Sequence, residues 1–129
     1  MRTHPRVIPK GRDQHEYGFS LIEILVVLAV LGLLAAIAIP QFIEYRRQSI
    51  DAQMNSDLRN AAVAVESYYA KQSFYPASIA EITTYGFQAT AGVDLTIVID
   101  SPTAYTITAT KPGGSQPSFA FQSATGSIQ

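Results

Sequence analysis

An uninterrupted apolar run near the start of the chain constrains the fold more than any other feature. Residues 24–39 contain no charged side chain. At about 1.5 Å per residue they make a helix of about 24 Å, and residues 19–23 extend it to about 32 Å. Because the hydrocarbon core of a bilayer is about 30 Å thick, the run predicts a membrane-spanning helix with Glu23 near one edge.

The segment before this run has a different character. Residues 1–18 contain four Lys or Arg, two acidic residues, two prolines and two glycines. This composition argues against a stable helix and favours a leader or tail that is not part of the fold. Four basic residues precede the run and three follow it closely, which favours a cytoplasmic N-terminus.

Beyond Pro40 the helical pattern continues, but on one face only. The apolar positions repeat with the spacing of an α-helix at Ile50, Met54, Leu58, Ala61, Val65 and Tyr68. The opposite face carries Arg47, Asp51, Asn55, Arg59 and Glu66. We therefore predict one long helix from residue 20 to about 72, with Pro40 as the place for a bend. Its second half is amphipathic and needs a partner to cover the apolar stripe.

The rest of the chain predicts that partner. Period-two alternation and β-branched residues indicate strands at 94–100, 104–110 and 118–122, with a candidate final strand at 125–128. A short helix is expected within 77–84, after Pro76. The linkers 101–103 and 112–117 suit antiparallel turns. The predicted fold is α+β: a long N-terminal helix, membrane-spanning in its first half, packed on a small antiparallel β-sheet.

Composition argues against an enzyme. The chain has no cysteine, and its two histidines, His4 and His15, both lie before Gly18. Without the first 18 residues, the chain lacks the usual general base, the usual thiol nucleophile and the commonest metal ligands. Residues 19–129 carry five basic and eight acidic side chains, so nucleic-acid binding is not indicated. We expect no catalytic residue, metal or cofactor.

Three residues of the apolar run have competing interpretations. Glu23 either pairs locally at the membrane edge or meets a cation in an apolar assembly, since intramembrane charges usually face a partner. Cleavage after Gly18 would create such a cation, the α-amino group of Phe19. Gly32 and Pro40 either serve packing or bracket a segment in which the helix unwinds readily.

The sequence GFSLIE, which starts at Gly18 and precedes an apolar run with Gly32 and Pro40, resembles the class III signal and N-terminal helix of type IV pilins. The resemblance implies that a prepilin peptidase cuts between Gly18 and Phe19 and methylates the new amine of Phe19. It implies that Glu23 neutralises the N-terminal amine of a neighbouring subunit, and that the helix loses order between Gly32 and Pro40 in filaments.

The resemblance also implies a domain plan and a location. Residues 1–18 are the prepilin leader, 19–43 the transmembrane and assembly helix, and 44–129 the globular head. The expected partners are other copies in a homopolymeric filament, the prepilin peptidase, the pilus assembly machinery and, before assembly, the bacterial inner membrane. The mature subunit is expected in an extracellular fimbrium, as the structural subunit of a type IV pilus.

Two departures from the family pattern leave alternatives open. The leader ends Glu16-Tyr17-Gly18, where many family members carry Lys-Gly or Arg-Gly. The chain also lacks the C-terminal disulfide of many type IV pilins. A major pilin, a minor pilin and a type II secretion pseudopilin all remain open, although Asp94 and Asp100 are too sparse for the calcium site of many major pseudopilins.

Two other classes of protein fit parts of the sequence. The residues Ala36-Ile37-Ala38 match a signal-peptidase pattern, which would release a soluble binding module that starts at Ile39. An uncleaved chain would be a single-span protein with an anchored sensor domain. The mature N-terminus separates these classes.

Overall fold

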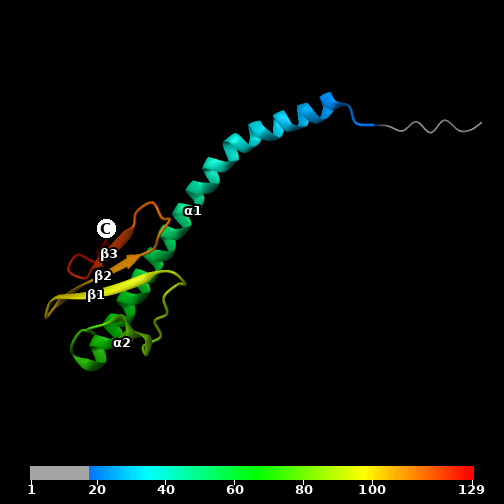
Figure 1. The fold of residues 1–129 in the computed structure, drawn as a ribbon. Helices are drawn as coiled ribbons and strands as arrows, with labels where there is room; N and C mark the ends of the chain where they lie inside the picture. Colours follow the sequence, from blue (N-terminus) through cyan, green and yellow to red (C-terminus); the bar gives the residue numbers. More distant parts are fainter. Residues whose placement is uncertain (1–17) are drawn as a thin grey trace, which may run out of the picture. The chain divides into compact units, whose positions relative to one another are not determined.

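The computed structural model describes residues 18–129 and shows an α+β fold (Figure 1). Helix α1 spans Leu21–Gln72 and the short helix α2 spans Ile79–Thr83. Four strands follow: β1 (Asp94–Ser101), β2 (Ala104–Thr110), β3 (Ser118–Gln122) and β4 (Ser127–Ile128). The predictions of one long helix, a short helix within 77–84 and the strands are confirmed. The leader predicted at 1–18 lies, apart from Gly18, outside the described residues.

Local chemistry explains where α1 ends. Ser73 takes the left-handed conformation, with a φ of 64°, and its amide donates to the carbonyl of Tyr69 at 2.8 Å. This is the left-handed cap that terminates many helices, and Pro76 follows shortly after it. Within the helix, Pro40 has no amide hydrogen to give to the carbonyl of Ala36, so one rung of the hydrogen-bond ladder is missing there.

The chain divides into two compact units, the first ending at Ile37 and the second running from Ala38 to Gln129. The described part of the first unit is the apolar start of α1, and its side chains are exposed. Helix α1 contains a stretch long and apolar enough to cross a membrane, and none of that stretch is buried within the chain. The exposed aliphatic surface needs either lipid or other protein to cover it.

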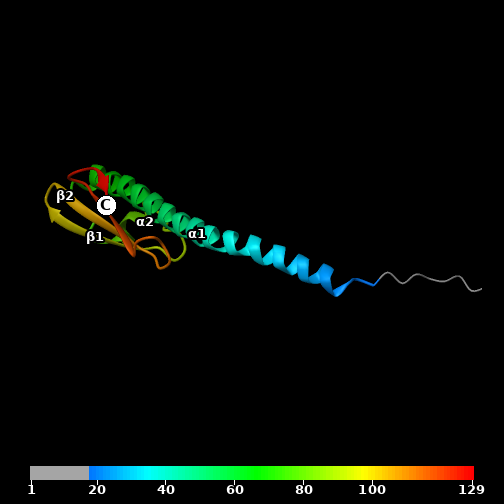
Figure 2. The same ribbon diagram turned by 90° about the horizontal axis from the view of Figure 1, so that it is seen from above.

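The second unit is a head in which a sheet covers one side of α1. The strand order is β1-β2-β3-β4, and all three pairings are antiparallel. Figure 2 shows the sheet lying along the C-terminal half of the helix. The register places Ile97 opposite Ile107 and Ile107 opposite Phe121, so three apolar side chains line up across the sheet on its helix-facing side.

The core of the head forms between this face and the predicted stripe of α1. All six predicted stripe positions are buried. They pack with Tyr105, Ile107 and Ala109 of β2 and with Ile82, Phe87 and Val93 of the α2–β1 segment. Burying one Leu or Ile side chain stabilises the fold by about 1.5–3 kcal/mol. One strand position departs from expectation: Ile99 is exposed, because it lies at the end of edge strand β1, next to an irregularity in the ladder.

Candidate processing and assembly site

Glu23 lies in the first turn of α1, where its carboxylate has a local partner. Its Oε2 accepts a hydrogen bond of 2.7 Å from the backbone amide of Ser20. This is one half of a capping box, in which a Glu at the third helical position satisfies an amide that the helix itself cannot pair. The positive end of the helix dipole also favours a carboxylate at this position. The Ser-x-x-Glu spacing is a sequence signal for this contact that the sequence analysis above did not use.

The residues around the predicted scissile bond are open to solvent. Gly18, Phe19 and Ser20 are all exposed. A shallow groove of 450 Å³ follows the same face of the helix, lined by Phe19, Ile22, Glu23, Val26 and Val27. One carboxylate is therefore set in an otherwise apolar surface, four residues after Phe19. A basic group that approaches this groove would meet Glu23 as its only charged side chain.

Gly32 and Pro40 both lie inside α1. A methyl group built on Gly32 would meet no atom within 4 Å, so packing within the chain does not require glycine at this position. The missing ladder rung at Pro40 and the low helix propensity of glycine both weaken the intervening segment. Loss of helical order between them stays a prediction.

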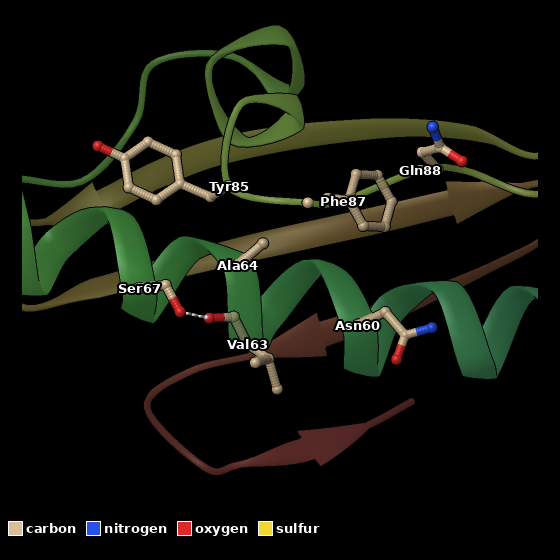
Figure 3. Close-up of a pocket in the computed structure, with 8 residues that line it drawn as sticks. Asn60, Val63, Ala64, Ser67, Tyr85, Phe87 and Gln88 are labelled. Carbon is tan, nitrogen blue, oxygen red and sulfur yellow. Dashed lines mark hydrogen bonds between the residues drawn. The ribbon is translucent and has the colours of Figure 1, made fainter.

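The head itself has an exposed groove bounded by α1 and the segment after α2. Its volume is 330 Å³. Its lining residues come from α1 (Asn60, Val63, Ala64 and Ser67) and from the segment 85–88. Figure 3 shows Ala64 pointing from the helix toward Tyr85 and Phe87. Among residues 18–129 there is no cluster of three or more His, Cys, Asp or Glu side chains that could hold a metal ion.

A buried carboxylate, Asp57, is the polar feature of the head that the sequence analysis missed. Asp57 is 3% exposed and lies on the apolar face of α1. Its Oδ2 accepts a hydrogen bond from the amide of Thr90 at 2.7 Å, and its Oδ1 accepts one from the Thr90 hydroxyl at 2.9 Å. The available signal was its position, three residues after Met54 and four before Ala61, where the helix pattern calls for an apolar side chain.

Two further polar contacts fix loops to α1 near Asp57. Asp51 accepts hydrogen bonds from the amide and the hydroxyl of Ser115, in the β2–β3 loop. The Lys111 ammonium donates to Oε1 of Gln53 and to the carbonyl of Ala91, both at 2.8 Å. The contacts of Asp51, Lys111 and Asp57 therefore hold two loops on one stretch of the helix, and we call them the three loop clamps.

Glu66 makes a polar contact across the helix–sheet interface. Its Oε1 accepts a hydrogen bond of 3.0 Å from the hydroxyl of Tyr105, on β2. Burial of the phenol and then the neighbouring Glu66 carboxylate raise the pKa of Tyr105 well above its usual range. The tyrosine stays neutral as a donor, and the carboxylate is held in one orientation.

Comparison with known proteins identifies the family. Residues 13–39 match the family described as the prokaryotic N-terminal methylation motif. The chain is 33% identical over 98 residues to the type IV wide pilus major component PilA4 of Thermus thermophilus, with 75% of each chain covered. The chain belongs to the type IV pilin family.

Other relatives show the breadth of this type IV pilin family. The chain is 33% identical over 81 residues to the type IV major pilin protein PilA of Myxococcus xanthus, covering 57% of this chain and 37% of that protein. It is 34% identical over 65 residues to the type II secretion system core protein G of Pseudomonas aeruginosa, covering 50% and 46%. The chain therefore has a pilin-type role, and its relatives include subunits of pili and a protein of a secretion system.

Proposed function

We propose that this pilin is the structural subunit of a type IV pilus filament. A prepilin peptidase cleaves the leader, residues 1–18, after Gly18 on the cytoplasmic side and methylates the amine of Phe19. Residues 19–43 hold the subunit in the inner membrane until the assembly machinery moves it into an extracellular filament. Residues 44–129 form the head, and the chain acts as a structural protein and not as an enzyme.

The observation that supports this proposal best is the placement of Glu23. It is the one charged side chain between Phe19 and Ile39, in a segment whose apolar side chains are all exposed. Bundling such helices removes apolar surface from lipid or water, but packing alone sets no register along the bundle. A carboxylate in an apolar environment is costly unless it is paired, so it sets a register by requiring a cation at its own level.

Cleavage after Gly18 supplies such a cation, the Phe19 amine, four residues before Glu23 in the same chain. A pair between these two groups within one chain would not fix the position of a neighbouring subunit. A copy displaced by about four residues, or about 6 Å at about 1.5 Å per residue, brings its Phe19 amine to the level of Glu23. The hydrogen bond from the Ser20 amide holds the carboxylate at this level. The pair then forms between subunits and repeats along the polymer.

Glu23 accepts a capping hydrogen bond and also carries a charge, and two substitutions separate these roles. Glu23→Gln removes the charge and keeps an oxygen that can accept the Ser20 amide, because Gln also serves in capping boxes. Glu23→Ala removes both. We expect both variants to enter the membrane and both to lose filament assembly. A Glu23→Gln variant that forms filaments at the wild-type level would refute the charge-pairing proposal.

The processing step is tested by the intact mass and N-terminal sequence of the mature chain. We expect a start at Phe19 and the added mass of one methyl group. A start at Ile39 would indicate a secreted module instead, and an intact Met1 would indicate an anchored single-span protein. Gly18→Ala with the rest of the leader unchanged should leave the precursor uncut.

Similarity to the type II secretion core protein supports a second candidate, a pseudopilin. Deletion of the chain distinguishes the two. A pilus subunit gives loss of surface filaments in electron micrographs with secretion unchanged. A pseudopilin gives loss of protein secretion with surface pili still present.

A further inference from the structure

Two side chains of opposite charge, Arg59 and Glu66, lie on one exposed side of α1. Arg59, Val63 and Glu66 follow one another at intervals of four and three residues, which places them on one side of the helix. All three are exposed, and Val63 is 68% exposed in spite of its aliphatic side chain. Figure 3 shows the Val63 side chain projecting outward from the helix. The sheet does not bury these three side chains, although Tyr105 of β2 reaches the Glu66 carboxylate.

The two charges do not pair with each other within one chain. Seven residues separate them, so they lie about 10.5 Å apart along a helix that rises about 1.5 Å per residue. The single ion pair within residues 18–129 joins Glu44 and Arg47 at 3.9 Å, both well exposed. Arg59 and Glu66 are therefore available to form ion pairs with groups outside their own chain.

The surroundings of Glu66 suit an arginine. The carboxylate borders a groove of 490 Å³, whose other walls include Ala62, Ala70, Tyr105 and Phe121. Tyr105 donates to Oε1 of Glu66, which orients the carboxylate, and Oε2 accepts no hydrogen bond within the described residues. Such a groove can hold a side chain with an apolar stem and a cationic head, and a guanidinium also stacks well on aromatic rings.

We propose that Arg59 of one subunit enters this groove on the next subunit and pairs with its Glu66. The proposal rests on the filament proposed above and adds a second ion pair within the head. Each subunit offers one Arg59 and one groove. A parallel, head-to-tail contact of this kind can therefore repeat without closing, as a polar filament requires.

The contact sets a register that agrees with the proposed N-terminal one. A copy whose Arg59 lies level with a neighbour's Glu66 is displaced, relative to that neighbour, toward the C-terminal end of the neighbour's helix by seven residues, or about 10.5 Å. Pairing the Phe19 amine of the same copy with the neighbour's Glu23 displaces that copy in the same direction by four residues, or about 6 Å. The difference is small enough for the long, flexible side chains of Arg and Glu to span.

An antiparallel arrangement would also bring these charges together. Two copies related by a twofold axis near Val63 would form two Arg59–Glu66 pairs, but such a pair of subunits is closed and cannot extend. The size of cross-linked products therefore distinguishes the two arrangements.

The cysteine-free chain makes cross-linking a direct test. Full-length chain carrying both Asn60→Cys and Ser67→Cys is treated in cells with a short bismaleimide. These exposed positions lie next to Arg59 and Glu66 and have the same seven-residue spacing, so both charges of the proposed pair stay in place. A bismaleimide is used because an Arg–Glu contact leaves the neighbouring Cβ atoms too far apart for a disulfide. We expect a ladder of dimers, trimers and larger species. Each single-cysteine variant serves as the control and should stay monomeric. Products limited to dimers, or a double variant that behaves like the single ones, would overturn the proposal.

Charge exchange provides a test that does not depend on cross-linking. Arg59→Glu and Glu66→Arg should each reduce the yield of filaments about tenfold or more, because each places like charges in the contact. The double exchange should restore the yield. Glu66→Gln keeps an oxygen for Tyr105 and should also reduce the yield, whereas Asp94→Lys, on exposed strand β1, is the matched control and should not.

These tests separate this contact from the filament proposal itself. Normal assembly of both single-exchange variants, with Glu23→Gln still defective, would overturn the Arg59–Glu66 contact and leave the filament role in place. Absence of the chain from wild-type filaments would instead refute the filament role, and the contact with it.

Discussion

Replacing Asp57 with alanine tests whether one buried carboxylate holds the α2–β1 segment on the helix. Asp57 is the buried charged residue of the described chain, and both of its oxygens accept hydrogen bonds from Thr90, 33 residues away. The side chain of Asp57→Ala reaches neither donor. Thr90 itself is exposed, so water can replace the lost acceptor once the segment moves away.

The expected cost follows from these contacts. Each hydrogen bond to a charged group is worth about 1.5–3 kcal/mol, so the two together contribute about 3–6 kcal/mol. The variant is also relieved of the cost of burying a carboxylate, which reduces the net loss to about 2–4 kcal/mol. For a head of this size, that loss lowers the melting temperature by about 10–20 °C.

The assay is thermal unfolding of the full chain in detergent, followed by near-ultraviolet circular dichroism of the head tyrosines. Thr90→Val is the partner variant, because it keeps the amide donor and loses the hydroxyl, and we expect it to cost about 1–2 kcal/mol. In a double-mutant cycle, the two changes should show a coupling of about 1 kcal/mol. A melting temperature for Asp57→Ala within about 2 °C of wild type, or strict additivity in the cycle, would refute this reasoning.

Two more predictions concern the head. Gly114→Ala places a methyl group against the Asp51 carboxylate, and thermal unfolding should show a loss of stability of about 1–3 kcal/mol. Gly86 has open space around it but a φ of +88°, so Gly86→Ala should lose about 1–2 kcal/mol from backbone strain alone. A Gly114→Ala variant as stable as the wild type would contradict the close approach at Gly114. The raised pKa of Tyr105 means that the folded state keeps the phenol proton to higher pH than the unfolded state does, so its stabilisation is complete below about pH 10 and is lost as the pH rises further. Tyr105→Phe should therefore show a shallower loss of melting temperature above pH 10 than wild type, and an unchanged slope would count against this.

The elements of the fold were readable in the sequence because local rules and burial agree there. The 3.6-residue period of the stripe that begins at Ile50 predicted which face of α1 is buried, and alternation predicted the helix-facing side chains of β2. Pro76 and the Pro/Gly-rich linker 112–117 marked ends and turns. Ile99 was wrongly expected to be covered, because alternation predicts which face of the sheet a side chain is on but not how far the helix and loops extend over that face.

The polar contacts were less accessible to prediction. Asp57 breaks the apolar pattern visibly, but its partner Thr90 depends on the path of the α2–β1 segment, which no local rule fixes. The bond from the Ser20 amide to Glu23 is local, and the capping-box spacing would have predicted it. Glu66 was expected on the solvent face and is exposed there, yet its contact with Tyr105, 39 residues away, depends on the tertiary packing of β2 on α1.

The three loop clamps have a consequence for how this head can be made and used. A disulfide would hold such loops with a covalent bond between sulfur atoms, which forms only after oxidation, and the chain has no cysteine to form one. Here carboxylate and ammonium groups hold the loops through hydrogen bonds. Folding of the head therefore needs neither an oxidant nor a thiol–disulfide isomerase. It proceeds in the same way in a reducing and in an oxidising compartment. A loop pulled off the helix by mechanical load can also return to its place, since no sulfur bond has to break or re-form.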